Sequence, residues 1–187
     1  GTVSPLVVVS SCSEAGYLNI GDVLILQGVS AEDVRGPVIN IDSFDGFYPI
    51  FDGNEVVALN LSGNVIELDH DSCLLVYVAR PMGAQIIHRV FVKVNTSNGM
   101  YIITKGDSNP YPDQMWFSED AAGICWDNND GRCISTAVKN EMIVGKQATF
   151  SIPLLGHVKL FFCDITLGLL CEGHSNAGTG YDYKLWC

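Results

Sequence analysis

The chain has 187 residues, of which 48% are hydrophobic and 17% charged, so it can build one folded domain with a substantial core and is not disordered. Its net charge is −11 and it has only 10 Lys and Arg residues, so no basic surface is available for phosphate contacts and no nucleic-acid partner is expected. No apolar run reaches the roughly 18 uncharged residues that would cross a bilayer.

Short segments rich in β-branched residues follow one another along the chain, separated by clusters of Gly, Asn, Asp and Pro. They predict strands at Leu6–Val9, Val23–Gln27, Val38–Ile41, Val56–Leu61, Val65–Leu68, Cys73–Val78, Ile86–Val94, Met100–Thr104, Met142–Val144, Ala148–Ile152 and Val158–Phe162. Helical periodicity is scarce and predicts no more than a turn at 30–34 and at 118–122. The fold class is therefore mainly β, with the strands folded into a barrel or sandwich.

One predicted hairpin brings polar residues together. Asn98-Gly99 supplies the positive φ of a tight turn, and antiparallel pairing about it sets residue 94 opposite residue 103. This register brings His88 towards residues 107 to 109, so His88 and Asp107 are expected at the same edge of the sheet. A cluster of serines, residues 10 to 13, follows the first strand, where a side chain is exposed but held by the sheet.

The seven cysteines show neither CxxC nor zinc-finger spacing, so no metal site is expected. Cys125/Cys133 and Cys163/Cys171 are pairs whose spacing suits disulfide-closed loops in an oxidising compartment, with buried free thiols as the alternative. Two glycosylation sequons, at Asn60 and Asn95, also favour an extracytoplasmic location.

Four motifs resemble the boxes of type I signal peptidases, in the archaeal and endoplasmic-reticulum branch that uses a histidine base. They are Ser10-Ser11-Cys12-Ser13 with Gly21-Asp22-Val23, His88-Arg89-Val90, Thr104-Lys105-Gly106-Asp107-Ser108-Asn109 with Pro112-Asp113, and Gly145-Lys146 with Ile152-Pro153-Leu154-Leu155-Gly156. They occur in the family's order and cover residues 6 to 160. The resemblance implies a signal-peptidase-like folded β-sheet core and a serine endopeptidase that cleaves secretory precursors through an acyl-enzyme, without metal or cofactor.

The resemblance also implies a role for each site residue. Ser13 is the nucleophile, and His88 is the base, because an unperturbed histidine is largely neutral at pH 7 and can accept the hydroxyl proton. Asp113 orients His88 and stabilises the imidazolium, and Asp107 supports the aspartate corner. The backbone amide of Ser13 and the hydroxyl of Ser11 donate to the oxyanion. The substrate peptide lies extended along a strand edge, where small pockets select Ala-like residues.

The serine box departs from the family pattern. The family usually has Ser-x-Ser-Met-x-Pro, whereas Glu14-Ala15-Gly16 follow Ser13 here. A second register puts Cys12 at the nucleophile position but needs an inserted residue before Gly21, so we favour Ser13. The alternatives are a catalytically inactive relative that binds extended peptides, a LexA-like self-cleaving peptidase with a lysine base, and a non-enzymatic secreted β-module.

A single catalytic β-domain over residues 1–187 is expected, with an inserted lobe at approximately 39–72. Four aromatic residues of the lobe are predicted to form its core, with an exposed membrane-facing patch as the alternative. These residues are Phe44, Phe47, Tyr48 and Phe51. The resemblance implies an N-terminal membrane anchor ahead of the present first residue. We therefore expect a membrane-anchored protein with its catalytic domain on the extracytoplasmic face, acting on precursors with small residues at the cleavage site.

Overall fold

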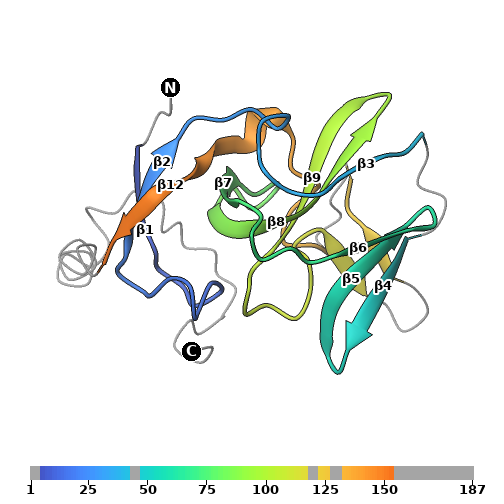
Figure 1. Ribbon diagram of the computed structural model, residues 1–187, viewed down its shortest axis with the longest axis horizontal. Helices are drawn as coiled ribbons and strands as arrows, with labels where there is room; N and C mark the ends of the chain where they lie inside the picture. The colour runs from blue at the N-terminus through green and yellow to red at the C-terminus, as the bar shows by residue number, and fades with distance from the viewer. Residues whose placement is uncertain (1–4, 43–46, 118–121, 127–131, 154–187) are drawn as a thin grey trace.

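The computed structural model describes residues 5–42, 47–117, 122–126 and 132–153 (Figure 1). The predicted strand Val158–Phe162, the pair Cys163/Cys171 and Phe44 lie outside these residues. Within them, the structure is mainly β and contains no α-helix, so the predicted fold class is confirmed at this level. None of the described sheets closes on itself into a barrel.

The largest sheet has seven strands, in the order β1-β2-β12-β7-β8-β3, with β9 paired to β8. Their bounds are Leu6–Val8 for β1, Val23–Gln27 for β2, Ile143–Ile152 for β12, Leu74–Val78 for β7, Gln85–Thr96 for β8, Val38–Asn40 for β3 and Gly99–Lys105 for β9. All neighbours pair antiparallel except β3 and β8, which are parallel. The strands predicted at 142–144 and 148–152 are one strand, β12, with an irregularity between Gln147 and Ser151.

Most of the segment predicted as an inserted lobe forms a separate three-stranded antiparallel sheet, which lies to one side of β8 and β9 (Figure 1). Its strands are β4 (Phe47–Asp52), β5 (Glu55–Leu61) and β6 (Asn64–Glu67). The inner face of this sheet, including Leu59 and Leu61, belongs to the same buried cluster as Phe91 and Val92 of β8. The lobe therefore shares a core with the main sheet.

Two elements of the lobe region differ from the prediction. The strand β4 was missed because Pro49 interrupts its pattern, and proline is tolerated there because β4 is an edge strand. Tyr48 and Phe51 are 65% and 43% exposed, so the prediction that they form the lobe core is wrong; of the three predicted aromatic residues that the structure describes, Phe47 alone packs against the buried cluster. A hairpin of β10 (Met115–Phe117) and β11 (Ala122–Ile124) was also not predicted.

Strand β8 is the centre of the fold, because every residue from 88 to 94 is buried. Phe91 packs on the cluster shared with the lobe, and Val90 packs on a second cluster that includes Leu75 and Tyr77. Its apolar residues pack on both faces, as expected for a buried strand, whereas Arg89 and Lys93 are buried with hydrogen bonds to backbone carbonyls of neighbouring segments. His88 lies at the start of this rigid stretch.

The predicted register of the β8–β9 hairpin is wrong by two residues. Val94 pairs with Tyr101 and not with residue 103, because Gly99, with a φ of 115°, pairs directly with Thr96 and shortens the turn. A bulge between residues 90 and 92 then shifts the ladder again, so Arg89 pairs with Lys105. The predicted consequence survives, since His88 and the segment after β9 still meet at one edge.

Candidate functional site

The structure joins His88 and Asp113 in a buried pair. The Nδ1 atom of His88 and the Oδ2 atom of Asp113 are 2.6 Å apart, and the two residues are 5% and 0% exposed. Asp113 is fixed by its own backbone, because its N–H donates to Thr104 O at 2.9 Å and its carbonyl accepts from Ser135 N at 3.2 Å. The carboxylate is therefore held against the histidine by the strand that precedes it.

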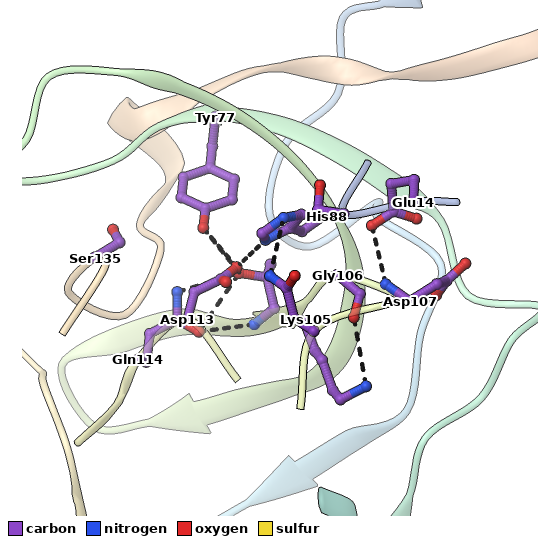
Figure 2. Close-up of polar contacts among 12 residues, drawn as sticks. Glu14, Tyr77, His88, Lys105, Gly106, Asp107, Asp113, Gln114 and Ser135 are labelled. Atoms are coloured by element: carbon purple, nitrogen blue, oxygen red, sulfur yellow. Dashed lines mark hydrogen bonds and ion pairs between the residues drawn. The ribbon is translucent and has the colours of Figure 1, made fainter. Parts of the chain in front are cut away.

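Two further hydroxyl groups converge on the same carboxylate oxygen, and Figure 2 shows the one from Tyr77. Tyr77 Oη donates to Asp113 Oδ2 at 2.8 Å, and Thr104 Oγ1 donates to it at 2.7 Å. Burial, together with the negative charge of Asp113, raises the pKa of Tyr77 well above its ordinary value, so Tyr77 remains a donor. The second oxygen, Oδ1, is buried and has no hydrogen-bond partner in the described part of the chain. These contacts fix the orientation of Asp113, and the sequence had not identified Tyr77 or Thr104 as residues that would do so.

The other ring nitrogen of His88 faces the Ser13 loop across Gly106. Because Nδ1 contacts a carboxylate, we assign the proton to Nδ1, which leaves a lone pair on Nε2. A Cβ atom added to Gly106 would lie 2.9 Å from His88 Nε2 and 2.9 Å from the carbonyl oxygen of Ser13. Asn109 Nδ2 lies 3.5 Å from Nε2. Only a glycine at 106 allows the histidine ring and the serine loop to approach this closely.

Ser13 lies in the loop between β1 and β2, whose ends are tied by hydrogen bonds of Val9 with Gly21 and Asp22, the two residues before β2. Its carbonyl accepts from Ser108 N at 2.8 Å, and its side chain is only partly buried. Its Oγ atom lies 3.3 Å from Ser11 Oγ. Among the described residues, no hydrogen bond joins Ser13 Oγ to His88. The three predicted residues Ser13, His88 and Asp113 thus gather at one site, with the serine hydroxyl turned towards Ser11.

The alternative nucleophile, Cys12, is disulfide-bonded, so it carries no thiol in this structure. A disulfide also joins Cys125 and Cys133, with 6.4 Å between their Cα atoms, as their spacing predicted. Cys73 is the free cysteine of the described residues. Two disulfide-bonded segments in the described chain fit an oxidising compartment.

Asp107 pairs with the residue next to His88 and not with the histidine itself. Arg89 donates to both carboxylate oxygens of Asp107, at 2.7 Å from Nε and 2.6 Å from Nη2, and its Nη1 donates to the carbonyls of His70 and Ser72. Burial alone would raise the pKa of Asp107, but the hydrogen bonds and charge of Arg89 outweigh it and hold the pKa below its ordinary value. This placement agrees with a supporting role for Asp107.

Sequence reasoning did not identify Glu14 as part of the site. It is 2% exposed, its Oε1 accepts from Asp107 N at 3.3 Å, and its Oε2 has no hydrogen-bond partner in the described part of the chain. Burial, and next the charge of Asp107, raise its pKa to about 9. The one signal in the sequence was the acidic residue directly after Ser13.

Lys105, two residues before Asp107, points away from His88 (Figure 2). Its Nζ donates to Glu55 Oε1 at 2.6 Å and to Gly106 O at 3.4 Å, and the residue is fully buried. Within the described ranges, no three His, Cys, Asp or Glu side chains are grouped so that they could hold a metal ion. No helix among these residues has the length and apolar character needed to span a bilayer.

No family model, curated protein or solved structure matches the chain. A function can therefore be inferred only from the chemistry of the site and from the sequence motifs that form it.

Proposed function

We propose that the chain is the catalytic β-domain of a serine endopeptidase of the archaeal and endoplasmic-reticulum signal peptidase kind. The observation that carries the proposal is the buried His88–Asp113 pair, whose other ring nitrogen, Nε2, lies close to the Ser13 loop across Gly106. A hydroxyl is a poor nucleophile until an oriented base accepts its proton, and this pair provides such a base.

In the proposed reaction, Ser13 Oγ attacks the scissile carbonyl while its proton passes to His88 Nε2. Asp113 stabilises the imidazolium, which then protonates the leaving amine, and a water activated by His88 hydrolyses the acyl-enzyme. The Ser13 amide and the Ser11 hydroxyl donate to the oxyanion. The proposed reaction requires the Ser13 side chain to rotate away from Ser11 and Oγ to reach Nε2, because catalytic hydrogen bonds are often made only with substrate bound.

An extended substrate fits the edge of β8. Residues 85 to 88 pair with β7 on one side, and the β9 ladder on the other side begins only at Arg89. Along this stretch, no strand of the described chain occupies the second edge. A peptide that pairs there by main-chain hydrogen bonds ends beside His88. We propose secretory precursors with small residues before the cleaved bond as the substrates, cleaved on the extracytoplasmic face by a membrane-anchored protein.

The test is cleavage of a precursor with an Ala-x-Ala site by the anchored, full-length protein in vesicles. Ser13→Ala and His88→Ala should each lower kcat/KM by at least about 10³-fold, because either change removes the nucleophile or its base. Glu67→Ala, a change at an exposed residue at the end of β6, should leave the rate unchanged. Full activity in Ser13→Ala would refute the proposal.

The second candidate is an inactive relative that binds extended peptides. It is favoured by the orientation of Ser13 Oγ towards Ser11 and by Glu14-Ala15-Gly16 after the serine. Binding of the precursor at the β8 edge with no cleavage by the intact protein would support it. A lysine-base mechanism is disfavoured, since Lys105 is paired with Glu55.

A further inference from the structure

Three hydrogen bonds attach the loop that carries Ser13 to the corner after β9. Ser108 N donates to Ser13 O at 2.8 Å, Asp107 N donates to Glu14 Oε1 at 3.3 Å, and Ser108 Oγ donates to Ala15 O at 3.4 Å. The loop uses backbone carbonyls at two of these positions and a side chain at one. Glu14 is therefore the only side chain of the loop in this set of contacts.

Among the described residues, no cation forms an ion pair with Glu14. Arg89 faces it from β8, but both carboxylate oxygens of Asp107 already accept from that guanidinium. From the loop itself, the ring of Tyr17 lies 5.3 Å from Arg89 Cζ. From the segment before β7, His70 Nδ1 lies 3.9 Å from Asp107 Oδ1. The cationic groups around Glu14 are thus directed at Asp107, and its own Oε2 is buried without a partner in the described chain.

A buried carboxyl group beside a carboxylate favours its neutral form. Burial first, and then the charge of Asp107, raise the pKa of Glu14 to about 9, although the charge of Arg89 acts in the opposite direction. Glu14 is then neutral at physiological pH. Its ionisation would place a second negative charge next to Asp107 and compete for Arg89, the neighbour of His88 in β8.

We propose that Glu14 is a positioning residue: as a neutral acid it holds the Ser13 loop against Asp107 and Ser108, and its ionisation releases the loop and inactivates the site at alkaline pH. The catalytic part of this inference rests on the proposed peptidase function, because displacement of the Ser13 loop can lower a rate of cleavage only if the protein cleaves peptides. The part that concerns folding does not depend on it.

The first measurement is the pH dependence of kcat/KM for the full-length protein, from about pH 6 to about pH 10. Wild type should lose activity about tenfold per pH unit above the pKa of Glu14. Glu14→Gln, which keeps the Oε1 acceptor and cannot ionise, should retain near wild-type activity at neutral pH and lack this alkaline fall. Glu67→Gln, which removes an exposed carboxylate at the end of β6, should behave as wild type.

The second measurement is the Tm of the same variants as a function of pH. In the folded protein the pKa of Glu14 lies above its ordinary value of 4.5, so the folded state binds the proton more tightly and loses stability as pH rises from 4.5 to about 9. The Tm of Glu14→Gln should therefore exceed that of wild type increasingly over this range. Glu67→Gln should show no such trend.

The two measurements separate the two proposals. If no variant cleaves the precursor, the peptidase function fails, and the Tm series still decides whether Glu14 is a buried neutral acid. Parallel Tm curves for wild type and Glu14→Gln would overturn the inference. An unchanged alkaline fall in Glu14→Gln, or a loss of activity in that variant at neutral pH with normal Tm, would overturn it as well.

Discussion

Tyr77→Phe removes one hydroxyl group from the buried cluster around Asp113 and leaves the aromatic ring in place. The hydroxyl donates to Asp113 Oδ2 at 2.8 Å and lies 3.1 Å from Thr104 Oγ1. A buried hydrogen bond to a charged group contributes about 1.5–3 kcal/mol to stability. Asp113 Oδ2 keeps two other donors, Thr104 and His88, so we expect the lower part of this range, about 1.5–2 kcal/mol.

Urea unfolding at neutral pH measures this loss as a lower midpoint with an unchanged m value. Tyr48→Phe is the matched control, because Tyr48 is 65% exposed and its change should stay within about 0.5 kcal/mol. A cycle with Thr104→Val should give a coupling energy above about 0.5 kcal/mol, since both hydroxyls share one carboxylate oxygen. If Tyr77→Phe is as stable as wild type, Asp113 is not oriented by this bond and the reasoning fails.

Lys105, the last residue of β9, and Gly106, which follows it, each make a close contact that a substitution can test. Glu55→Ala should lower the free energy of unfolding, measured with urea, by about 1–3 kcal/mol, because it leaves the fully buried Lys105 without its carboxylate partner. This range already allows for solvent screening at the Glu55 side chain, which is 49% exposed. Lys105→Met should cost less stability, and equal losses in the two variants would contradict the argument that an unpaired buried charge causes the loss. Gly106→Ala should lower stability by about 1–3 kcal/mol and strongly reduce cleavage, because its Cβ would lie 2.9 Å from a backbone oxygen of the serine loop. Gly53→Ala, where a Cβ meets no atom within 4 Å, should leave cleavage unchanged.

Most strands could be predicted from the sequence because a half-buried or buried strand requires β-branched and apolar residues at fixed positions. The pair formed by His88 and the segment after β9 was also predictable, since a single hairpin separates them and local pairing brings them to one edge. The register itself was not, because the turn at Gly99 and the bulge after Val90 change the pairing without changing the hydrophobic pattern.

By itself, then, the sequence determined the β class, the hairpin and the types of residue at its edge. The family resemblance had also placed Ser13 beside His88, but only the tertiary structure showed that the Ser13 loop approaches it across Gly106. It alone decided that Tyr77 of β7 reaches Asp113 and that Glu55 of the lobe reaches Lys105. It also decided that Glu14 is buried, although an acidic residue in a polar turn is ordinarily exposed. The physical reason is that burial and charge pairing depend on which segments pack together, and no local periodicity encodes contacts between distant parts of the chain.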